Sequence, residues 1–252
     1  MAEGLQQACI VIPALDAERT IARVIADVTS TIPELHASIL VVDDGSRDET
    51  ARIARDAGAI VLPSAGADGP PRNLGKGAAL RAGFEAARAR GHAIAVTVDA
   101  DGQHPAREAR RLLLVRGARP ATDTLVLGIR DLVRDGAPRA NVMSNGISNW
   151  FLSRFAGREL RDTQCGLRRY PIDRTLALGA RGNGYDFEAE LLLRAVWAGM
   201  EILEEPVDVV YPEDRETHFH PARDPWRIVR TIVGALGDRW LGPAVKPQDE
   251  ET

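Results

Sequence analysis

The sequence predicts a single α/β domain built on a mainly parallel β-sheet that helices cover on both faces. Over the first half of the chain, short runs of β-branched and other apolar residues alternate with longer helical stretches. These apolar runs lack the alternation of a strand with one solvated face, so we expect both faces of the sheet to be buried. With 252 residues, 44% of them hydrophobic, the chain is long enough to bury such a core.

The elements predicted for the first half follow one another as strand and helix in turn. Each strand prediction rests on an apolar run, and each helix prediction on a helix-forming stretch. Asp48 is placed to cap one helix and Gly58 to end it. A Gly- and Pro-rich loop is expected over 63–75. The strands are expected at 8–12, 38–43, 59–62, 93–98 and 124–128, and the helices at 18–30, 48–58, 76–91 and 106–117.

The pattern changes after residue 130. A helix that carries Trp150 is expected over 139–156, and a second helix over 185–199. Residues 200–212 predict one strand or a pair of strands. The polar tail that starts at Lys246 has the composition of a disordered segment.

Composition excludes several classes of function. The net charge of −4 provides no basic surface for nucleic acid. Cys9 and Cys165 fit neither a disulfide framework nor the ligand spacing of a zinc site, which suits a reducing compartment. The N-terminus has no signal-peptide pattern, and no apolar run approaches the ~20 residues of a membrane span. We therefore expect a cytoplasmic protein, either free or bound at the inner face of the plasma membrane.

Acidic side chains follow two of the predicted strands. Asp43 and Asp44 end one strand, and Asp99 and Asp101 end another. Asp and Gly also form turns, so each pair alone has that simpler explanation. Because parallel strands end at the same edge of a sheet, the two pairs are expected to lie close together and to repel one another. A divalent cation or hydrogen-bond donors would offset this repulsion.

Two familiar loops do not account for these residues. In "DADGQ" the glycine comes two positions too early for an EF-hand, and no Glu closes the loop. The segment "NLGKGAA" lacks the first glycine of a P-loop and the Ser or Thr after its Lys.

Lys76 is unusual in this chain. Of 32 basic residues only Lys76 and Lys246 are lysine. Arginine cannot replace a compact ammonium group everywhere, so Lys76 is predicted to supply a point charge that the site requires. The alternative is an ordinary lysine at the start of a helix.

Several segments resemble, in order and spacing, the motifs of family 2 glycosyltransferases with a GT-A fold. The branch most similar is that of the polyprenyl-phosphate hexose synthases, which includes dolichyl-phosphate mannose synthase and its bacterial relatives. The resemblance runs from about residue 8 to about residue 240, and no single motif decides it. The segments are "IVIPALDAERTI", "ILVVDDGSRDET", "NLGKGAALRAGF", "VTVDADGQHP", "LGIRD" and "DTQCGLRRY".

The resemblance implies a glycosyltransferase domain over residues 1–240. Its nucleotide-sugar half would span about 8–130 and its acceptor half 131–222. An amphipathic helix over 223–241 and a tail over 242–252 would follow.

The resemblance also implies a metal site. Asp99 and Asp101 would form the Asp-x-Asp motif, and Gln103 would help them to hold Mg²⁺ or Mn²⁺ against the donor diphosphate. Such a cation acts as a Lewis acid, because it neutralises the charge that builds on the departing nucleoside diphosphate.

The donor site follows from the same resemblance. It implies that Pro13, Ala14, Asp43 and Asp44 line the pocket for the base and ribose, and that Asn73 and Lys76 lie beside the nucleotide and the sugar. The family usually reads Pro-x-x-Asn-Glu after the first strand, whereas this chain has Asp16 and Ala17 at the last two positions. Glu18 is then the next acid available, and the base that the donor carries stays open.

On the acceptor side the resemblance implies three residues. Asp162, in "DTQCG", corresponds to a carboxylate that is a general base in most relatives. A polyprenyl phosphate is already anionic, so Asp162 would then orient the acceptor. Arg130 and Arg139 are predicted to grip the acceptor phosphate, because a guanidinium group suits a phosphate. The alternative is that both are solvated loop arginines.

Residues 213–228 resemble the mobile loop that closes over the donor. Arg215 and His218 are predicted to contact the diphosphate, and a two-histidine metal site with His220 is an alternative. The segment 223–241 predicts a helix with Trp226 and Trp240 near its ends. This helix either packs on the core or lies on an anionic membrane surface.

These expectations describe a metal-dependent, inverting glycosyltransferase. It would move a hexose from a nucleotide sugar, of the GDP-mannose or UDP-glucose type, to a polyprenyl phosphate. Two alternatives stay open: transfer to a soluble saccharide or protein acceptor, and a non-catalytic subunit that binds nucleotide sugars. The sequence does not predict an oligomeric state.

Overall fold

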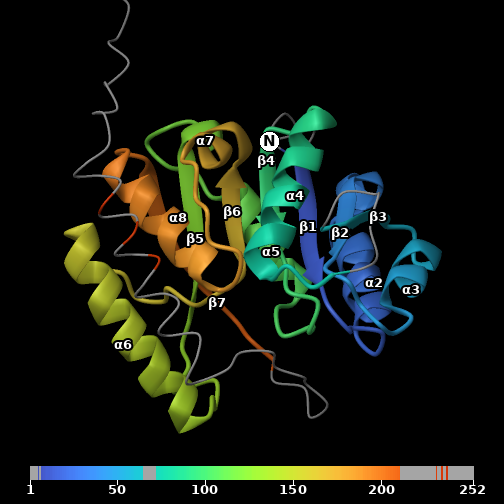
Figure 1. Cartoon of the computed structure of the whole chain (residues 1–252), viewed down its shortest axis with the longest axis horizontal. Helices are drawn as coiled ribbons and strands as arrows, with labels where there is room; N and C mark the ends of the chain where they lie inside the picture. The colour runs from blue at the N-terminus through green and yellow to red at the C-terminus, as the bar shows by residue number, and fades with distance from the viewer. Residues whose placement is uncertain are drawn as a thin grey trace, which may run out of the picture.

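The computed structural model describes residues 7–64 and 72–210, together with the isolated positions Leu5, Thr231, Gly234 and Gly237. Within this part of the chain a 7-stranded sheet forms the centre of the molecule (Figure 1). Its strands are β1 (Ala8–Ala14), β2 (Ile39–Asp43), β3 (Ile60–Pro63), β4 (Ile94–Thr97), β5 (Thr124–Arg130), β6 (Arg168–Pro171) and β7 (Glu201–Val207).

The strand order across the sheet is β3-β2-β1-β4-β6-β5-β7. All strands run parallel except β6, which is antiparallel to both of its neighbours, β4 and β5. The predicted α/β fold with a mainly parallel sheet is therefore confirmed. The carboxyl ends of β1, β2 and β4 lie at one edge, where ligands bind in sheets of this kind.

Helices cover both faces of the sheet, as the apolar runs predicted. The predicted helix over 139–156 is present with those bounds. The helices are α2 (Ile21–Thr31), α3 (Thr50–Asp56), α4 (Lys76–Ala89), α5 (Ala106–Leu114), α6 (Arg139–Ala156), α7 (Ile172–Ala177) and α8 (Asp186–Trp197), with short 3₁₀ helices η1 (Pro33–Ser38) and η2 (Ala121–Asp123).

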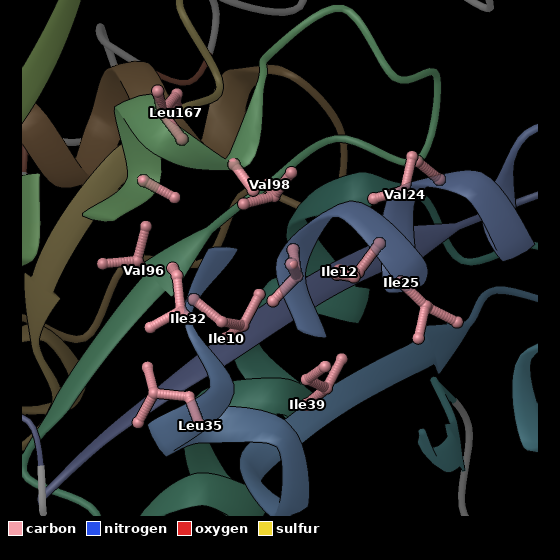
Figure 2. Packing of buried hydrophobic residues seen from close by; sticks show 14 of the residues in the cluster. Ile10, Ile12, Val24, Ile25, Ile32, Leu35, Ile39, Val96, Val98 and Leu167 are labelled. Carbon is pink, nitrogen blue, oxygen red and sulfur yellow. The ribbon is translucent and has the colours of Figure 1, made fainter. Parts of the chain in front are cut away.

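Two apolar clusters, one on each face of the sheet, explain why the strands show no alternation. In β1, Cys9 and Val11 pack with α4 and α8 on one face. Ile10 and Ile12 pack on the other face with α2 and η1, and Figure 2 shows this second cluster from close by. Each fully buried isoleucine contributes roughly 1.5–3 kcal/mol, so β1 is fixed from both sides.

The central strand β6 was not predicted, because its sequence begins with two arginines. Arg168 and Arg169 are both buried. The Arg168 guanidinium donates to the carbonyl oxygens of Cys165 (2.8 Å) and Thr163 (2.7 Å), and Arg169 donates to that of Val115 (2.7 Å). Carbonyl oxygens thus satisfy the whole Arg168 guanidinium group, whereas Arg169 is bonded through Nη1 and its Nε and Nη2 have no hydrogen-bond partner among the described residues.

Among the described residues, no helix combines the length and apolar character needed to cross a bilayer. The helix predicted over 223–241 lies outside the described residues except at three positions, of which Thr231 donates a hydrogen bond to the Asp186 carboxylate (2.8 Å). Residues 200–212 were predicted as one strand or two, and over the described part of this range, which ends at residue 210, the structure has the strand β7.

Candidate active site

The acids predicted at the strand ends do meet at one edge of the sheet. β1 lies between β2 and β4 and runs parallel to both. Past the end of β2, the Asp44 backbone N–H donates to the carbonyl of Ala14 (2.8 Å), which ties the two loops together. Pro13, Ala14 and Asp43 therefore share this edge with Asp99, which follows β4.

Lys76 contacts Asp99 directly. Its Nζ lies 2.8 Å from Asp99 Oδ1 and 3.1 Å from Glu188 Oε2, so the ammonium group bridges the loop after β4 to α8. The other face of the Asp99 carboxylate packs against Gly166, where an added Cβ would overlap its oxygens. Sequence reasoning placed Lys76 beside the nucleotide and sugar, and it did not anticipate Glu188.

The two acids of the Asp-x-Asp motif differ in their titration. Burial raises the pKa of Asp99, but the Lys76 ammonium outweighs this effect and holds that pKa below its usual range. Burial and the neighbouring Asp99 carboxylate raise the pKa of Asp101 to about 6. Within the described residues, the one hydrogen bond that the Asp101 carboxylate accepts comes from the backbone N–H of Gln103 (3.0 Å). Asp99 is thus paired with an ammonium group, whereas the charge of Asp101 is offset directly by one backbone N–H.

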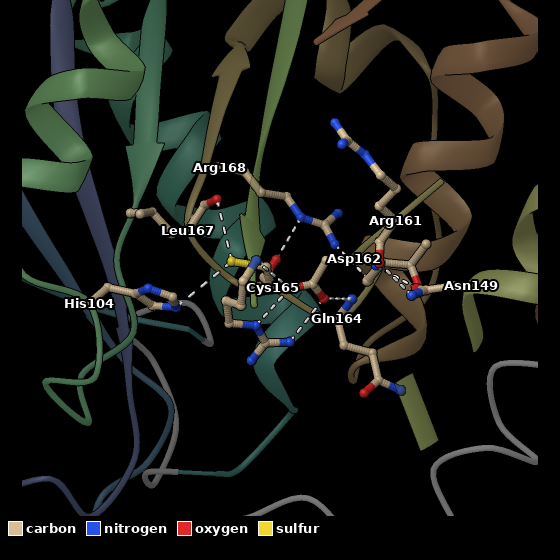
Figure 3. A network of polar contacts seen from close by, with 10 residues as sticks. His104, Asn149, Arg161, Asp162, Gln164, Cys165, Leu167 and Arg168 are labelled. Carbon is tan, nitrogen blue, oxygen red and sulfur yellow. Dashed lines mark hydrogen bonds and ion pairs between the residues drawn. The ribbon is translucent and has the colours of Figure 1, made fainter. Parts of the chain in front are cut away.

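Asp162 and Arg130 form a bidentate ion pair. Arg130 Nε donates to Asp162 Oδ2 (2.7 Å) and its Nη2 to Oδ1 (3.0 Å), while the Arg130 backbone N–H also donates to Oδ2 (3.1 Å). Figure 3 shows Asp162 within this polar network. Burial raises the pKa of Asp162, but the bonds from Arg130 outweigh it and the pKa is lowered. Such a carboxylate is a weak base.

His104 and Cys165 form a second buried pair beside the acids (Figure 3). Cys165 Sγ lies 3.8 Å from His104 Nε2. Burial lowers the pKa of His104 to about 4 and raises the pKa of Cys165 to about 12. Both side chains are thus neutral near pH 7, and Cys165 is not an activated nucleophile.

Asp44 binds the protein's own backbone. Its Oδ2 accepts the N–H of Gly75 (2.7 Å), and its Oδ1 accepts the N–H of Leu74 (3.0 Å) and the hydroxyl of Ser64 (2.6 Å). Gly75 has φ +101° and precedes α4 directly, so these bonds fix the entry of the helix that begins with Lys76. In the structure the Asp44 carboxylate positions the loop before α4, and its contact with base and ribose stays a prediction.

The loop after β1 is fastened to the loop after β2. Asp16 has φ +48° and accepts the Arg47 backbone N–H (2.7 Å), and Glu18 accepts that of Glu49 (3.1 Å). Asp43 accepts the N–H of Ser46 (3.1 Å). An acid at position 16 is well suited to this left-handed conformation, which Asp and Asn tolerate.

The remaining predicted site residues are less closely joined. Asn73 is exposed in the loop before α4, and Arg139 is exposed at the first position of α6. No described contact brings Arg139 to Arg130 or Asp162. Arg215 and His218 lie outside the described residues, as does the two-histidine alternative with His220.

Comparison with known proteins identifies the family. The profile of the family described as "Glycosyl transferase family 2" matches residues 9–115. Polyprenol monophosphomannose synthase of Mycolicibacterium smegmatis is 30% identical over 210 residues, which cover 80% of this chain and 77% of that protein. The chain belongs to glycosyltransferase family 2. It is therefore a glycosyltransferase, as predicted.

Two further relatives of this glycosyltransferase add detail. Undecaprenyl-phosphate mannosyltransferase of Micrococcus luteus is 29% identical, with 92% of this chain and 95% of that protein covered. A solved structure of glucosyl-3-phosphoglycerate synthase from Mycobacterium tuberculosis, in complex with Mn²⁺, UDP-glucose and phosphoglyceric acid, superposes with a TM-score of 0.66 at 21% identity. The superposition covers 95% of this chain and 81% of that one. It confirms the GT-A fold.

The acids of this glycosyltransferase fit a magnesium or manganese ion. Asp99 and Asp101 offer hard oxygen ligands, and Gly166 leaves the space that the Asp99 carboxylate occupies. Within the described residues no three His, Cys, Asp or Glu side chains converge as a closed metal site. Mg²⁺ is commonly held in this way, by one or two carboxylates with phosphate oxygens and water in the other positions.

Proposed function

We propose that this glycosyltransferase moves a hexose from a nucleoside-diphosphate sugar to a polyprenyl phosphate, with Mg²⁺ or Mn²⁺ as cofactor. The observation that carries the transferase chemistry is the half-buried edge of the sheet where Asp99, paired with Lys76, lies near Asp101. A divalent cation held by the two carboxylates would neutralise charge on the departing diphosphate. The names of the two polyprenyl-phosphate relatives support the acceptor class.

The state of Asp162 supports an acceptor that needs no deprotonation. Its pKa is lowered and both of its oxygens are bonded to Arg130. A sugar hydroxyl requires a base, whereas a phosphate oxygen is already anionic near neutral pH. Asp162 then acts by fixing the orientation of Arg130, and Arg130 presents its positive charge to the acceptor side.

An exposed apolar face on α6 supports a lipid acceptor. Met143, Ile147 and Trp150 are 67%, 62% and 71% exposed and follow the helical spacing i, i+4, i+7. The same helix has no acidic residue and carries Arg139 and Arg154, both exposed. Apolar side chains flanked by arginine suit the surface of an anionic membrane, where polyprenyl phosphates reside.

Transfer of labelled sugar tests this function. The purified chain is incubated with undecaprenyl phosphate, Mn²⁺ and either GDP-[¹⁴C]mannose or UDP-[¹⁴C]glucose, and the product is partitioned into organic solvent. We expect lipid-linked label that requires the cation and is lost in Asp101→Asn. Arg139→Ala is expected to raise KM for the lipid phosphate far more than KM for the donor.

Two outcomes would contradict the proposal. Label that enters only a water-soluble acceptor, such as 3-phosphoglycerate, would replace the lipid acceptor by a soluble one. Donor binding without transfer to any acceptor would favour a non-catalytic subunit.

A further inference from the structure

Glu188 is a buried acid to which the sequence assigned no role. It is the third residue of α8, and its side chain is 7% exposed. Glu188 Oε2 lies 3.1 Å from Lys76 Nζ, while its Oε1 has no hydrogen-bond partner in the described part of the chain. A buried carboxylate oxygen without a partner is unfavourable, so a packing role alone does not explain an acid here.

Lys76 needs more than one counter-ion where it stands. It is the first residue of α4, the end of a helix at which the dipole disfavours a positive charge. Its side chain is 15% exposed, and its Nζ lies within ion-pair distance of both the Asp99 and the Glu188 carboxylates. The ring of Tyr185, 5.7 Å away, provides a further contact.

Asp99 has two uses that conflict. It is a partner of Lys76 at 2.8 Å, and it is one of the two carboxylates that fit the divalent cation. If Asp99 were the only counter-ion of Lys76, any cation that drew on Asp99 would leave a buried ammonium uncompensated. Breaking a buried ion pair in that way is strongly destabilising.

We propose that Glu188 is a positioning residue for the divalent-cation site, which acts by holding Lys76 so that Asp99 remains able to bind the cation. The proposal rests on the proposed function, because it presupposes that Asp99 and Asp101 hold a cation. Glu188 acts through Lys76 rather than as a ligand, since no third acid converges with Asp99 and Asp101 in the described structure.

The close contact of α4 and α8 supports this arrangement. An added Cβ at Gly77, next to Lys76, would overlap Phe187, next to Glu188. The two helix ends therefore approach each other as closely as glycine permits, which fixes the distance between the lysine and the acid.

Manganese affinity provides a test that does not depend on turnover. The dissociation constant for Mn²⁺ alone is measured on the full chain from the electron paramagnetic resonance signal of free Mn²⁺. We expect Glu188→Gln to weaken binding about tenfold, within the range of coupling seen between contacting charged residues. Thermal denaturation without metal verifies that the variant is folded.

Glu190→Gln is the matched control. Glu190 lies on the same helix and is also buried, but it pairs with Arg194 (2.8 Å) and accepts the N–H groups of Arg181 and Gly182. It does not contact Lys76 in any described interaction. We expect its Mn²⁺ affinity to stay within twofold of the wild type.

A second variant keeps the test decisive if Glu188→Gln does not fold. Lys76→Met removes the ammonium that competes for Asp99, and we expect it to bind Mn²⁺ more tightly than the wild type. Weaker binding by Lys76→Met would overturn the proposal.

The other outcomes separate the two proposals. Unchanged affinity in a folded Glu188→Gln, or an equal loss in Glu190→Gln, would overturn the role of Glu188 and leave the proposed function intact. Absence of Mn²⁺ binding in the wild type would overturn both.

Discussion

Asp99 and Asp101 stand two positions apart and yet differ in pKa, because the Lys76 ammonium group contacts Asp99 directly. The pKa of Asp99 is lowered, whereas that of Asp101 is raised to about 6. In the metal-free protein Asp101 is therefore an acid whose ionisation opposes folding. The ionised Asp99 and Asp101 carboxylates repel each other. A cation that binds between them would offset this repulsion, so the same two charges would favour cation binding.

The pH dependence of stability follows from the raised pKa of Asp101. Its ordinary value is 3.8, so between about pH 4 and about pH 6 the native state binds more protons than the unfolded state. The stability of the metal-free protein therefore falls as the pH rises through this window. We expect Asp101→Asn to be more stable than the wild type by up to about 2–3 kcal/mol at pH 7–8, with a smaller difference toward pH 4.

Urea denaturation of both proteins across this pH range measures the effect. Mn²⁺ with a nucleoside diphosphate is the control, because it should stabilise the wild type and not Asp101→Asn. A difference in stability that stays constant with pH would contradict the role assigned to the Asp101 charge.

At the residue scale, the sequence identified acids at strand ends but not their partners. Asp99 and Asp101 could be predicted because Asp-x-Asp follows an apolar run. Glu188 could not, since it lies in a helix of ordinary composition and reaches Lys76 only after α4 and α8 pack together. The backbone partners of Asp44 were also beyond prediction, because they belong to the loop before α4.

Among the elements, α6 has two contrasting faces. Leu152 is buried in the apolar cluster that α8 shares, with Phe151 and Phe155 packed against it, while Met143, Ile147 and Trp150 are exposed. Removing apolar side-chain surface from water is favourable by roughly 25 cal/mol of free energy per Å² of that surface. We expect this face to be the membrane contact that the proposed acceptor requires.

Vesicle binding tests the α6 face. We expect the wild type to co-sediment with anionic vesicles, less so at high salt because the arginines are screened. The triple variant Met143→Ser, Ile147→Ser, Trp150→Ser should bind several-fold less while its melting temperature changes little. Leu114→Ser on α5, another exposed apolar residue, is the control and should bind as the wild type does.

Equal sedimentation of the triple variant and the wild type would exclude α6 as the contact. In that case the helix predicted over 223–241 becomes the segment to test, with Trp226→Ala and Trp240→Ala together. Its membrane role stays a prediction from the sequence.

At the scale of elements, most of the fold could be predicted from apolar runs and helical spacing. The central strand β6 was not predicted, since "LRRY" has two charged side chains where a central strand is expected to be apolar, and the short helices α7, η1 and η2 were not predicted either. Arg168 is accommodated because Thr163, Cys165 and Glu188 direct carbonyl oxygens at it, from segments on either side of the strand. These carbonyl oxygens meet around Arg168 only in the tertiary structure, so the local sequence could not predict them.

The whole molecule offers a test of donor binding, because a ligand that binds only the native state raises its melting temperature. At a concentration of 100 times Kd the gain is about 2.7 kcal/mol, which corresponds to roughly 5–10 °C for a chain of this size. We expect this shift for GDP or UDP in the presence of Mn²⁺, and the effective nucleotide identifies the donor base. Nucleotide with chelator is the control, and an equal shift without the cation would contradict metal-dependent donor binding.

The position of β6 affects how the chain is made as well as how it functions. β4 pairs with β1 on one side, but its other neighbour, Arg168–Pro171, is synthesised after β5 and α6. A nascent chain therefore carries an open strand edge at β4 until Arg168–Pro171 has been synthesised, and an open edge invites pairing with other chains. We therefore expect that the chain up to β5 is not an independent folding unit, and that any exchange of segments between relatives must carry β6 along with a compatible β4.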